Sequence, residues 1–168
     1  MRYLLDKSVV RRCLRGLIGG TLTDDVRHSL RLLRTFTPDE LYISLQTLHI
    51  LTHIIKVPQA RFIIARTTVL YPVKYTKRWA RRLREMGFKR EDAYLLSLAT
   101  FSTDQLKEGR ILGVNGFVTY DYHLQNHFLA LQPQLEIRLR RMAARLSPPY
   151  NRASLPTVNT PDQITSST

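Results

Sequence analysis

The sequence is poor in several residue types, and each shortage excludes a class of protein. Cys13 is the single cysteine among 168 residues, so an internal disulfide and a multi-cysteine zinc cluster are both excluded. The longest run without a charged side chain, residues 41–55, contains two histidines and is too short and too polar to cross a bilayer. Asp6 and Lys7 interrupt the first apolar stretch, so we expect no secretory signal, no membrane association and a reducing, cytoplasmic setting.

Acidic residues are scarce relative to basic ones. The chain has 13 Asp and Glu against 26 Lys and Arg, a formal net charge of +13, and residues 41–84 contain no acid. Such an excess favours association with nucleic acid or an anionic surface, although solvated basic helices are the simpler alternative. The length suits one domain with a core of its own.

Short apolar segments alternate with segments of helical periodicity. Strands are expected at 2–6, 41–44, 67–71 and 117–120, and helices at 8–15, 26–34, 47–56, 75–86, 91–101, 123–128 and 135–146. The alternation predicts an α/β fold, a mainly parallel sheet flanked by helices in a Rossmann-like, three-layer arrangement over residues 1–146. Twelve of the last 22 residues, 147–168, are Pro, Ser or Thr, which predicts a flexible tail.

Three of the few carboxylates are placed where a metal ion could bind. Asp6 and Asp121 each follow an apolar strand, and Asp92 lies in the first turn of an expected helix. Ligands bind at the carboxyl ends of strands in open α/β sheets, and hard cations such as Mg²⁺ take oxygen ligands. Each residue also has an ordinary alternative: Asp6 in a strand-to-helix turn, Asp92 at a helix dipole, and Asp121 as a helix cap.

Four segments resemble the PIN domain family. Residues 1–10, Met-Arg-Tyr-Leu-Leu-Asp-Lys-Ser-Val-Val, resemble its opening strand, and residues 42–47, Tyr-Ile-Ser-Leu-Gln-Thr, its second strand and the start of the next helix. Residues 91–99, Glu-Asp-Ala-Tyr-Leu-Leu-Ser-Leu-Ala, resemble its central helix. Residues 118–121, Val-Thr-Tyr-Asp, resemble its closing Thr-x-Asp strand end. The matches span residues 1 to about 130 in the family's order.

The resemblance implies a metal-dependent ribonuclease, and many bacterial and archaeal members of the family are toxins of toxin–antitoxin pairs. It implies that Asp6, Asp92 and Asp121 are catalytic and hold Mg²⁺ or Mn²⁺, with Ser8 and Thr119 orienting the carboxylates. It further implies an RNA substrate and allows an antitoxin or other protein partner and a homodimer.

The chain departs from the family pattern at two positions. The family usually has a Glu near Ile50, but residues 47–53 contain no acid, and Lys7 stands where a small residue is usual. His49 is a candidate substitute ligand, while the spacing of His49 and His53 also fits two polar residues on one helix face. Two functions therefore stay open: a ribonuclease, or a catalytically inactive PIN-like module that binds RNA or protein.

A basic stretch is the second functional candidate. Its basic residues, expected to contact nucleic acid along a phosphate backbone, are Lys77, Arg78, Arg81, Arg82, Arg84, Lys89 and Arg90. Trp79 and Leu83 are expected in the core, and a solvated helix face is the alternative. A smaller cluster comprises Arg138, Arg140, Arg141 and Arg145. A third hypothesis is a helical DNA-binding protein with residues 75–90 as its recognition helix, which requires that no parallel sheet forms.

Overall fold

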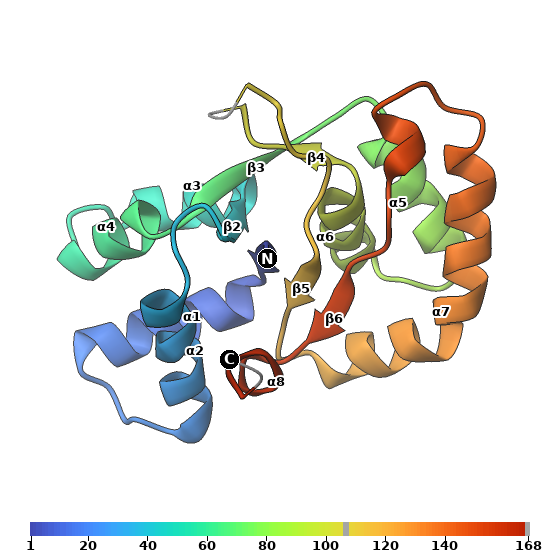
Figure 1. Ribbon diagram of the computed structural model, residues 1–168. Helices are drawn as coiled ribbons and strands as arrows, with labels where there is room; N and C mark the ends of the chain where they lie inside the picture. Colours follow the sequence, from blue (N-terminus) through green and yellow to red (C-terminus); the bar gives the residue numbers. More distant parts are fainter. Residues whose placement is uncertain (106–107, 167–168) are drawn as a thin grey trace. The chain divides into compact units, whose positions relative to one another are not determined.

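A computed structural model describes residues 1–105 and 108–166. The described residues form a six-stranded sheet in the order β4-β3-β2-β1-β5-β6 (Figure 1). Its strands are β1 (Tyr3–Leu5), β2 (Leu41–Ser44), β3 (Thr68–Pro72), β4 (Ser102–Thr103), β5 (Gly116–Val118) and β6 (Thr157–Asn159). β1 pairs with β2 in parallel and β4 pairs with β3 in antiparallel orientation. The predicted α/β class, a mainly parallel sheet flanked by helices, is confirmed.

Up to residue 121 the structure contains the five expected helices and one more, at residues 58–65, and beyond residue 121 the helices differ from the expected ones. They are α1 (Lys7–Ile18), α2 (Asp24–Thr35), α3 (Leu45–His53), α4 (Pro58–Ala65), α5 (Thr76–Glu85), α6 (Arg90–Thr100), α7 (Tyr122–Ala143) and α8 (Pro161–Thr165), with a 3₁₀ turn η2 (Tyr150–Arg152). Among the helices of the described ranges, none has the length and apolar character needed to cross a membrane.

The chain divides into two compact units, whereas the sequence predicted one domain over residues 1–146. The first unit contains Met1–Val69, Val118–Tyr120 and the segment from Asn159 onward, and the second contains Leu70–Phe117 and Asp121–Val158. The division follows tertiary contacts, since the chain leaves the first unit within β3 and re-enters it at β5 and β6, and the predicted domain bounds stay a prediction. No composition shift marks these crossings.

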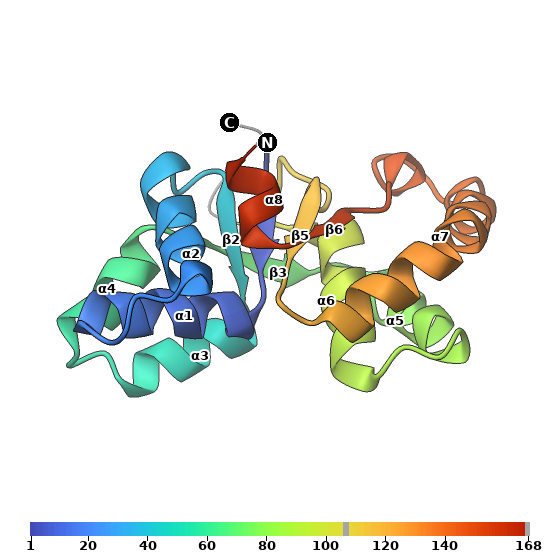
Figure 2. The same ribbon diagram turned by 90° about the horizontal axis from the view of Figure 1, so that it is seen from below.

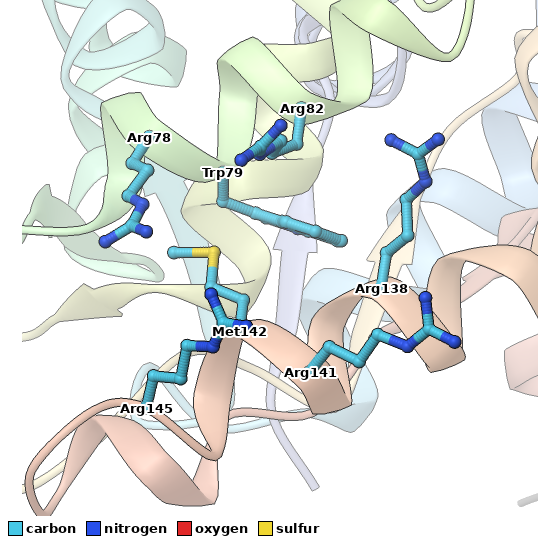
Figure 3. A pocket seen from close by; sticks show the side chains of 7 residues that line it. All are labelled: Arg78, Trp79, Arg82, Arg138, Arg141, Met142 and Arg145. Atoms are coloured by element: carbon cyan, nitrogen blue, oxygen red, sulfur yellow. The ribbon is translucent and has the colours of Figure 1, made fainter.

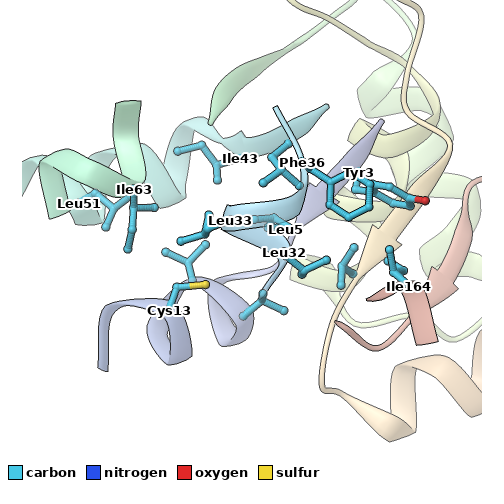
Figure 4. Packing of buried hydrophobic residues seen from close by; sticks show 14 of the residues in the cluster. Tyr3, Leu5, Cys13, Leu32, Leu33, Phe36, Ile43, Leu51, Ile63 and Ile164 are labelled. Carbon is cyan, nitrogen blue, oxygen red and sulfur yellow. The ribbon is translucent and has the colours of Figure 1, made fainter. Parts of the chain in front are cut away.

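The core of the first unit is built from apolar strands and the inner faces of α1–α4. Leu5, Ile43 and Val118 come from three strands and are at most 1 % exposed (Figure 4). Continuous burial along β1 and β2 is the pattern of strands covered on both faces. α1 ends at Gly19, whose φ of 95° is in the left-handed region that glycine adopts without strain.

The expected flexible tail is folded, and that prediction was wrong. Residues 157–159 form the edge strand β6, and α8 packs against α2 with Ile164 buried in the core (Figure 2). The polar residues that suggested flexibility build local structure: Pro161 occupies the first turn of α8, and Gln163 Oε1 accepts a hydrogen bond from the Thr160 backbone N–H (2.9 Å). Ser167 and Thr168 lie outside the described residues.

The second unit contains one long helix where two short ones were expected. α7 continues through Pro133 and changes direction along its length (Figure 1). Proline removes one backbone hydrogen bond and costs about 3 kcal/mol inside a helix. Buried residues on both sides of it, Phe128 and Leu135 among them, offset this cost and explain why the helix does not end there.

Candidate functional site

Asp6 lies at the point where the order of the sheet reverses. The chain builds β1, β2 and β3 in one direction across the sheet, and β5 and β6 then extend it from the other side of β1. Asp6 directly follows β1 and Thr119 directly follows β5, and the Asp6 backbone N–H donates to Val118 O (2.9 Å). Open α/β sheets bind their ligands at such a switch point.

Two hydroxyl groups hold the Asp6 carboxylate. Ser8 Oγ donates to Asp6 Oδ2 over 2.6 Å, and Thr119 Oγ1 donates to the same oxygen over 2.9 Å. Asp6 lies in the turn between β1 and α1, as its ordinary alternative proposed, and its side chain makes no capping hydrogen bond. Within the described residues nothing donates to Asp6 Oδ1, which leaves this oxygen for a cation.

A polar network next to Asp6 was missed by the sequence analysis. Arg12 donates to the Ser8 carbonyl (3.1 Å), lies over the Tyr120 ring (4.0 Å to its centroid) and pairs with Asp25 (3.4 Å). The Tyr120 hydroxyl donates to the Asp25 carbonyl (2.7 Å) and lies 3.0 Å from Ser29 Oγ. Burial raises the pKa of Tyr120 to about 12, so its hydroxyl stays protonated at neutral pH.

Cys13 is a buried structural thiol. Its side chain is fully buried, and its Sγ donates to the Ser29 carbonyl (3.3 Å). Burial raises the pKa of Cys13 to about 12, which removes thiolate chemistry at neutral pH.

The other two predicted metal ligands belong to the second unit. Asp121 accepts a hydrogen bond from the Leu124 backbone N–H (3.0 Å), so it caps α7 as its alternative explanation proposed. Asp92 and Glu91 lie in the first turn of α6, where the helix dipole favours acids. Over residues 1–105 and 108–166, no group of three or more His, Cys, Asp or Glu side chains is close enough to hold a metal ion.

His49 lies on an exposed face of α3. Its ring packs edge-on against that of His53 (centroids 4.3 Å apart), and His53 Nδ1 lies 2.7 Å from the His49 carbonyl oxygen. The arrangement is that of two polar residues on one helix face.

The predicted basic stretch divides into two surfaces. Arg78 and Arg82 face α7, whereas Arg81, Arg84 and Arg90 surround an open hollow beside Gly87 and Phe88. Trp79 and Leu83, each 1 % exposed, lie in the core, as expected from their place on the apolar face of α5.

The facing sides of α5 and α7 form an arginine pocket with a volume of about 300 Å³ (Figure 3). It is lined by Arg78, Trp79, Arg82, Arg138, Arg141, Met142 and Arg145. Figure 3 shows Trp79 and Met142 between arginines of the two helices. The sequence analysis found both arginine clusters but did not join them. The spacing of residues 138, 141 and 145 could have indicated a row of arginines on one side of the chain. That this row faces the arginines of α5 is known only from the tertiary packing.

The chain was compared with protein-family models, with curated proteins and with solved structures, and none of them matches it.

Proposed function

We propose that this chain is a divalent-metal-dependent ribonuclease of the PIN type, with Asp6 as the principal ligand of a Mg²⁺ or Mn²⁺ ion. The observation that carries the proposal is the Asp6 carboxylate at the switch point of the sheet, held there by Ser8 and Thr119. A buried carboxylate with an oxygen to which no described residue donates a hydrogen bond fits a hard cation, and Mg²⁺ commonly uses only one or two carboxylates together with substrate phosphates.

When bound, the ion lowers the pKa of a coordinated water and stabilises charge on the phosphodiester. Ser8 and Thr119 hold one carboxylate oxygen of Asp6 by hydrogen bonds. Because the carboxylate is planar and rigid, these bonds also fix the orientation of its other oxygen. Asp92 and Asp121, the other two ligands that the family resemblance implies, belong to the second unit, and their role stays a prediction. An RNA substrate, a protein partner such as an antitoxin, a homodimer and a cytoplasmic setting are the accompanying proposals from the family resemblance.

The test is cleavage of a labelled single-stranded RNA with Mg²⁺, with Mn²⁺ and with a chelator. Asp6→Asn keeps the size of the side chain and removes its charge, so we expect loss of cleavage with an unchanged circular dichroism spectrum. Asp24→Asn is the matched control, because Asp24 is exposed and pairs only with Arg27 on the surface (3.2 Å). Equal turnover by wild type and Asp6→Asn would remove Asp6 from the mechanism.

A second candidate is a PIN-like module that binds RNA without cleaving it. Two observations favour it: α3 carries no acid, and the Asp121 carboxylate is engaged in capping α7. Salt-sensitive RNA binding, with no divalent-dependent cleavage of any RNA tested, would select this candidate over the nuclease. The helical DNA-binding hypothesis required the absence of a parallel sheet, and the sheet is present.

A further inference from the structure

We propose that the arginine pocket between α5 and α7 binds a ligand that carries several adjacent phosphate groups. Five arginines from two helices converge on one cavity, and no acidic residue lines it. The inference is independent of the proposed nuclease activity, because it rests on residues of the second unit alone.

The charge of the pocket is compensated at only one of its five arginines by the described residues. Arg82 pairs with Glu85 (3.2 Å), and both side chains are about half exposed. No carboxylate of residues 1–105 or 108–166 lies within ion-pair distance of Arg78, Arg138, Arg141 or Arg145. Like charges gathered in one place repel one another and destabilise the folded state. The arrangement is therefore unfavourable when empty and favourable when an anion neutralises it.

The side chains select phosphate over other anions by geometry. A guanidinium group is planar, stays charged at all relevant pH values and donates two parallel hydrogen bonds to a phosphate or carboxylate. Arg138 and Arg141 lie at helical spacing on α7, Arg145 lies in the turn that follows this helix, and Arg78 and Arg82 lie at helical spacing on α5. Two rows of donors across one cavity suit a ligand with phosphate oxygens on both sides.

The amount of charge favours a polyphosphate over a single backbone phosphate. A phosphodiester carries one negative charge, and a terminal monoester about −1.5 to −2. The positive charge of five guanidinium groups at one cavity exceeds the negative charge of either group. A volume of about 300 Å³ accommodates a small ligand or the end of a chain, since ligand sites begin near this size. The shared chemistry is that of a triphosphate, either of a free nucleoside triphosphate or of a triphosphorylated RNA 5′ end.

The floor of the pocket supplies a second feature and a probe. Trp79 is 1 % exposed, and its indole Nε1–H has no hydrogen-bond acceptor among the described residues. A buried donor without a partner costs free energy, which adds to the cost of the empty pocket. Trp79 is also the one tryptophan of the sequence, so intrinsic fluorescence reports on this cavity alone.

The experiment titrates the full chain, carrying Asp6→Asn so that RNA stays intact, and follows Trp79 fluorescence. The probes are inorganic tripolyphosphate, ATP, and one short RNA with either a 5′-triphosphate or a 5′-hydroxyl end. We expect tripolyphosphate to change the fluorescence and to raise the melting temperature, with an affinity that falls steeply with salt. The double variant Arg138→Gln/Arg141→Gln should lose at least tenfold in affinity and, without ligand, should melt no lower than the parent.

Arg140→Gln is the control, because it removes one of the positive charges of the same helix, against two in the double variant, and Arg140 lines a different groove with Glu136 and Leu139. Stronger binding of ATP than of triphosphorylated RNA would assign the site to a free nucleotide, and the reverse to an RNA end. Three results would overturn the proposal: no response to tripolyphosphate, equal losses in Arg140→Gln and the double variant, or equal binding of the two RNA ends together with no binding of ATP.

Discussion

The Asp6 site of the first unit and the arginine pocket of the second hold their charges in opposite ways. Asp6 is one buried carboxylate, and two hydroxyl groups fix its direction. The pocket presents five arginines, most of them exposed and without a carboxylate partner among the described residues. The first arrangement supplies geometry for one small ion, and the second supplies charge density for a larger anion. The Asp6 site therefore depends on short hydrogen bonds that orient one carboxylate. The arginine pocket depends on the packing that brings its charged side chains together.

The C-terminal helix α8 stabilises the first unit through Ile164. Among the substitutions considered, Ile164→Ala should therefore cause the largest loss of stability. Ile164 is 7 % exposed within the core, so truncation should lower the free energy of unfolding by about 2–5 kcal/mol. Urea denaturation measures the loss. Ile137→Ala, at a position 49 % exposed, is the control and should change stability by less than about 0.5 kcal/mol. A loss at Ile164 no larger than the control's would mean that α8 is not part of the core.

Removing each hydroxyl group in turn tests whether Ser8 and Thr119 orient the Asp6 carboxylate. Ser8→Ala and Thr119→Val should each lower kcat of RNA cleavage by about 10–100-fold with little change in KM, because the partners of a metal-binding group act through its orientation. Thr119→Ser restores the hydroxyl and should recover most of the rate. A purely structural role would instead lower the melting temperature in both Thr119 variants and leave the rate of the folded enzyme unchanged.

A buried acid in the arginine-rich second unit offers a contrast with Asp6. Asp104 is fully buried, and neither carboxylate oxygen has a hydrogen-bond partner within residues 1–105 and 108–166. Asp104→Asn removes the uncompensated charge, so thermal or urea denaturation should show a gain of about 1–2 kcal/mol in stability. Asp24→Asn, with a carboxylate 84 % exposed, should show no comparable gain. A clear loss of stability in Asp104→Asn would indicate that a cation or another group compensates the carboxylate.

Alkaline pH should lower the stability of the first unit, and this effect should be the smallest of those predicted. Burial raises the pKa of Cys13 from 9.0 to about 12 and that of Tyr120 from 10.0 to about 12. A raised pKa means that the neutral form is favoured in the folded state. The stability from these two groups is therefore fully present below pH 9 and is lost as the pH rises towards 12. Urea denaturation between pH 8 and pH 11 should show this decline.

Tyr120→Phe should reduce the alkaline decline, because it removes one of the groups whose pKa burial raises. Tyr122→Phe is the matched control, since Tyr122 is 62 % exposed and two residues away. The same pH dependence in wild type and Tyr120→Phe would contradict the role assigned to the buried hydroxyl.

The sequence predicted what depends on short-range pattern. Apolar strands such as Leu41–Ser44 and the amphipathic α5 were found because burial on both faces, or on one helix face, leaves a local periodicity. Asp6 could be identified as a candidate ligand because the end of an apolar strand is recognisable from the neighbouring residues alone. The hydroxyl partners of Asp6 were expected from the family resemblance, and the structure shows the hydrogen bonds themselves.

The sequence failed where distant segments decide the structure. The C-terminal residues are Pro-, Ser- and Thr-rich, but β6 gains hydrogen bonds from its neighbours in the sheet, and α8 gains a hydrophobic contact through Ile164. Two short helices were expected at residues 123–128 and 135–146, yet packing on both sides of Pro133 continues α7 through it. The arginine pocket joins residues 78 and 145 across the facing helices, which no local period encodes.

Direct measurement of metal binding tests the central claim, that the carboxylate at the switch point holds a divalent ion. Mn²⁺ can be titrated into the wild type, Asp6→Asn and Asp24→Asn and followed by electron paramagnetic resonance of the free ion. The account predicts saturable binding by the wild type and by Asp24→Asn, and at least a tenfold weaker affinity for Asp6→Asn. Equal Mn²⁺ affinity in all three proteins, or no binding by the wild type, would contradict it.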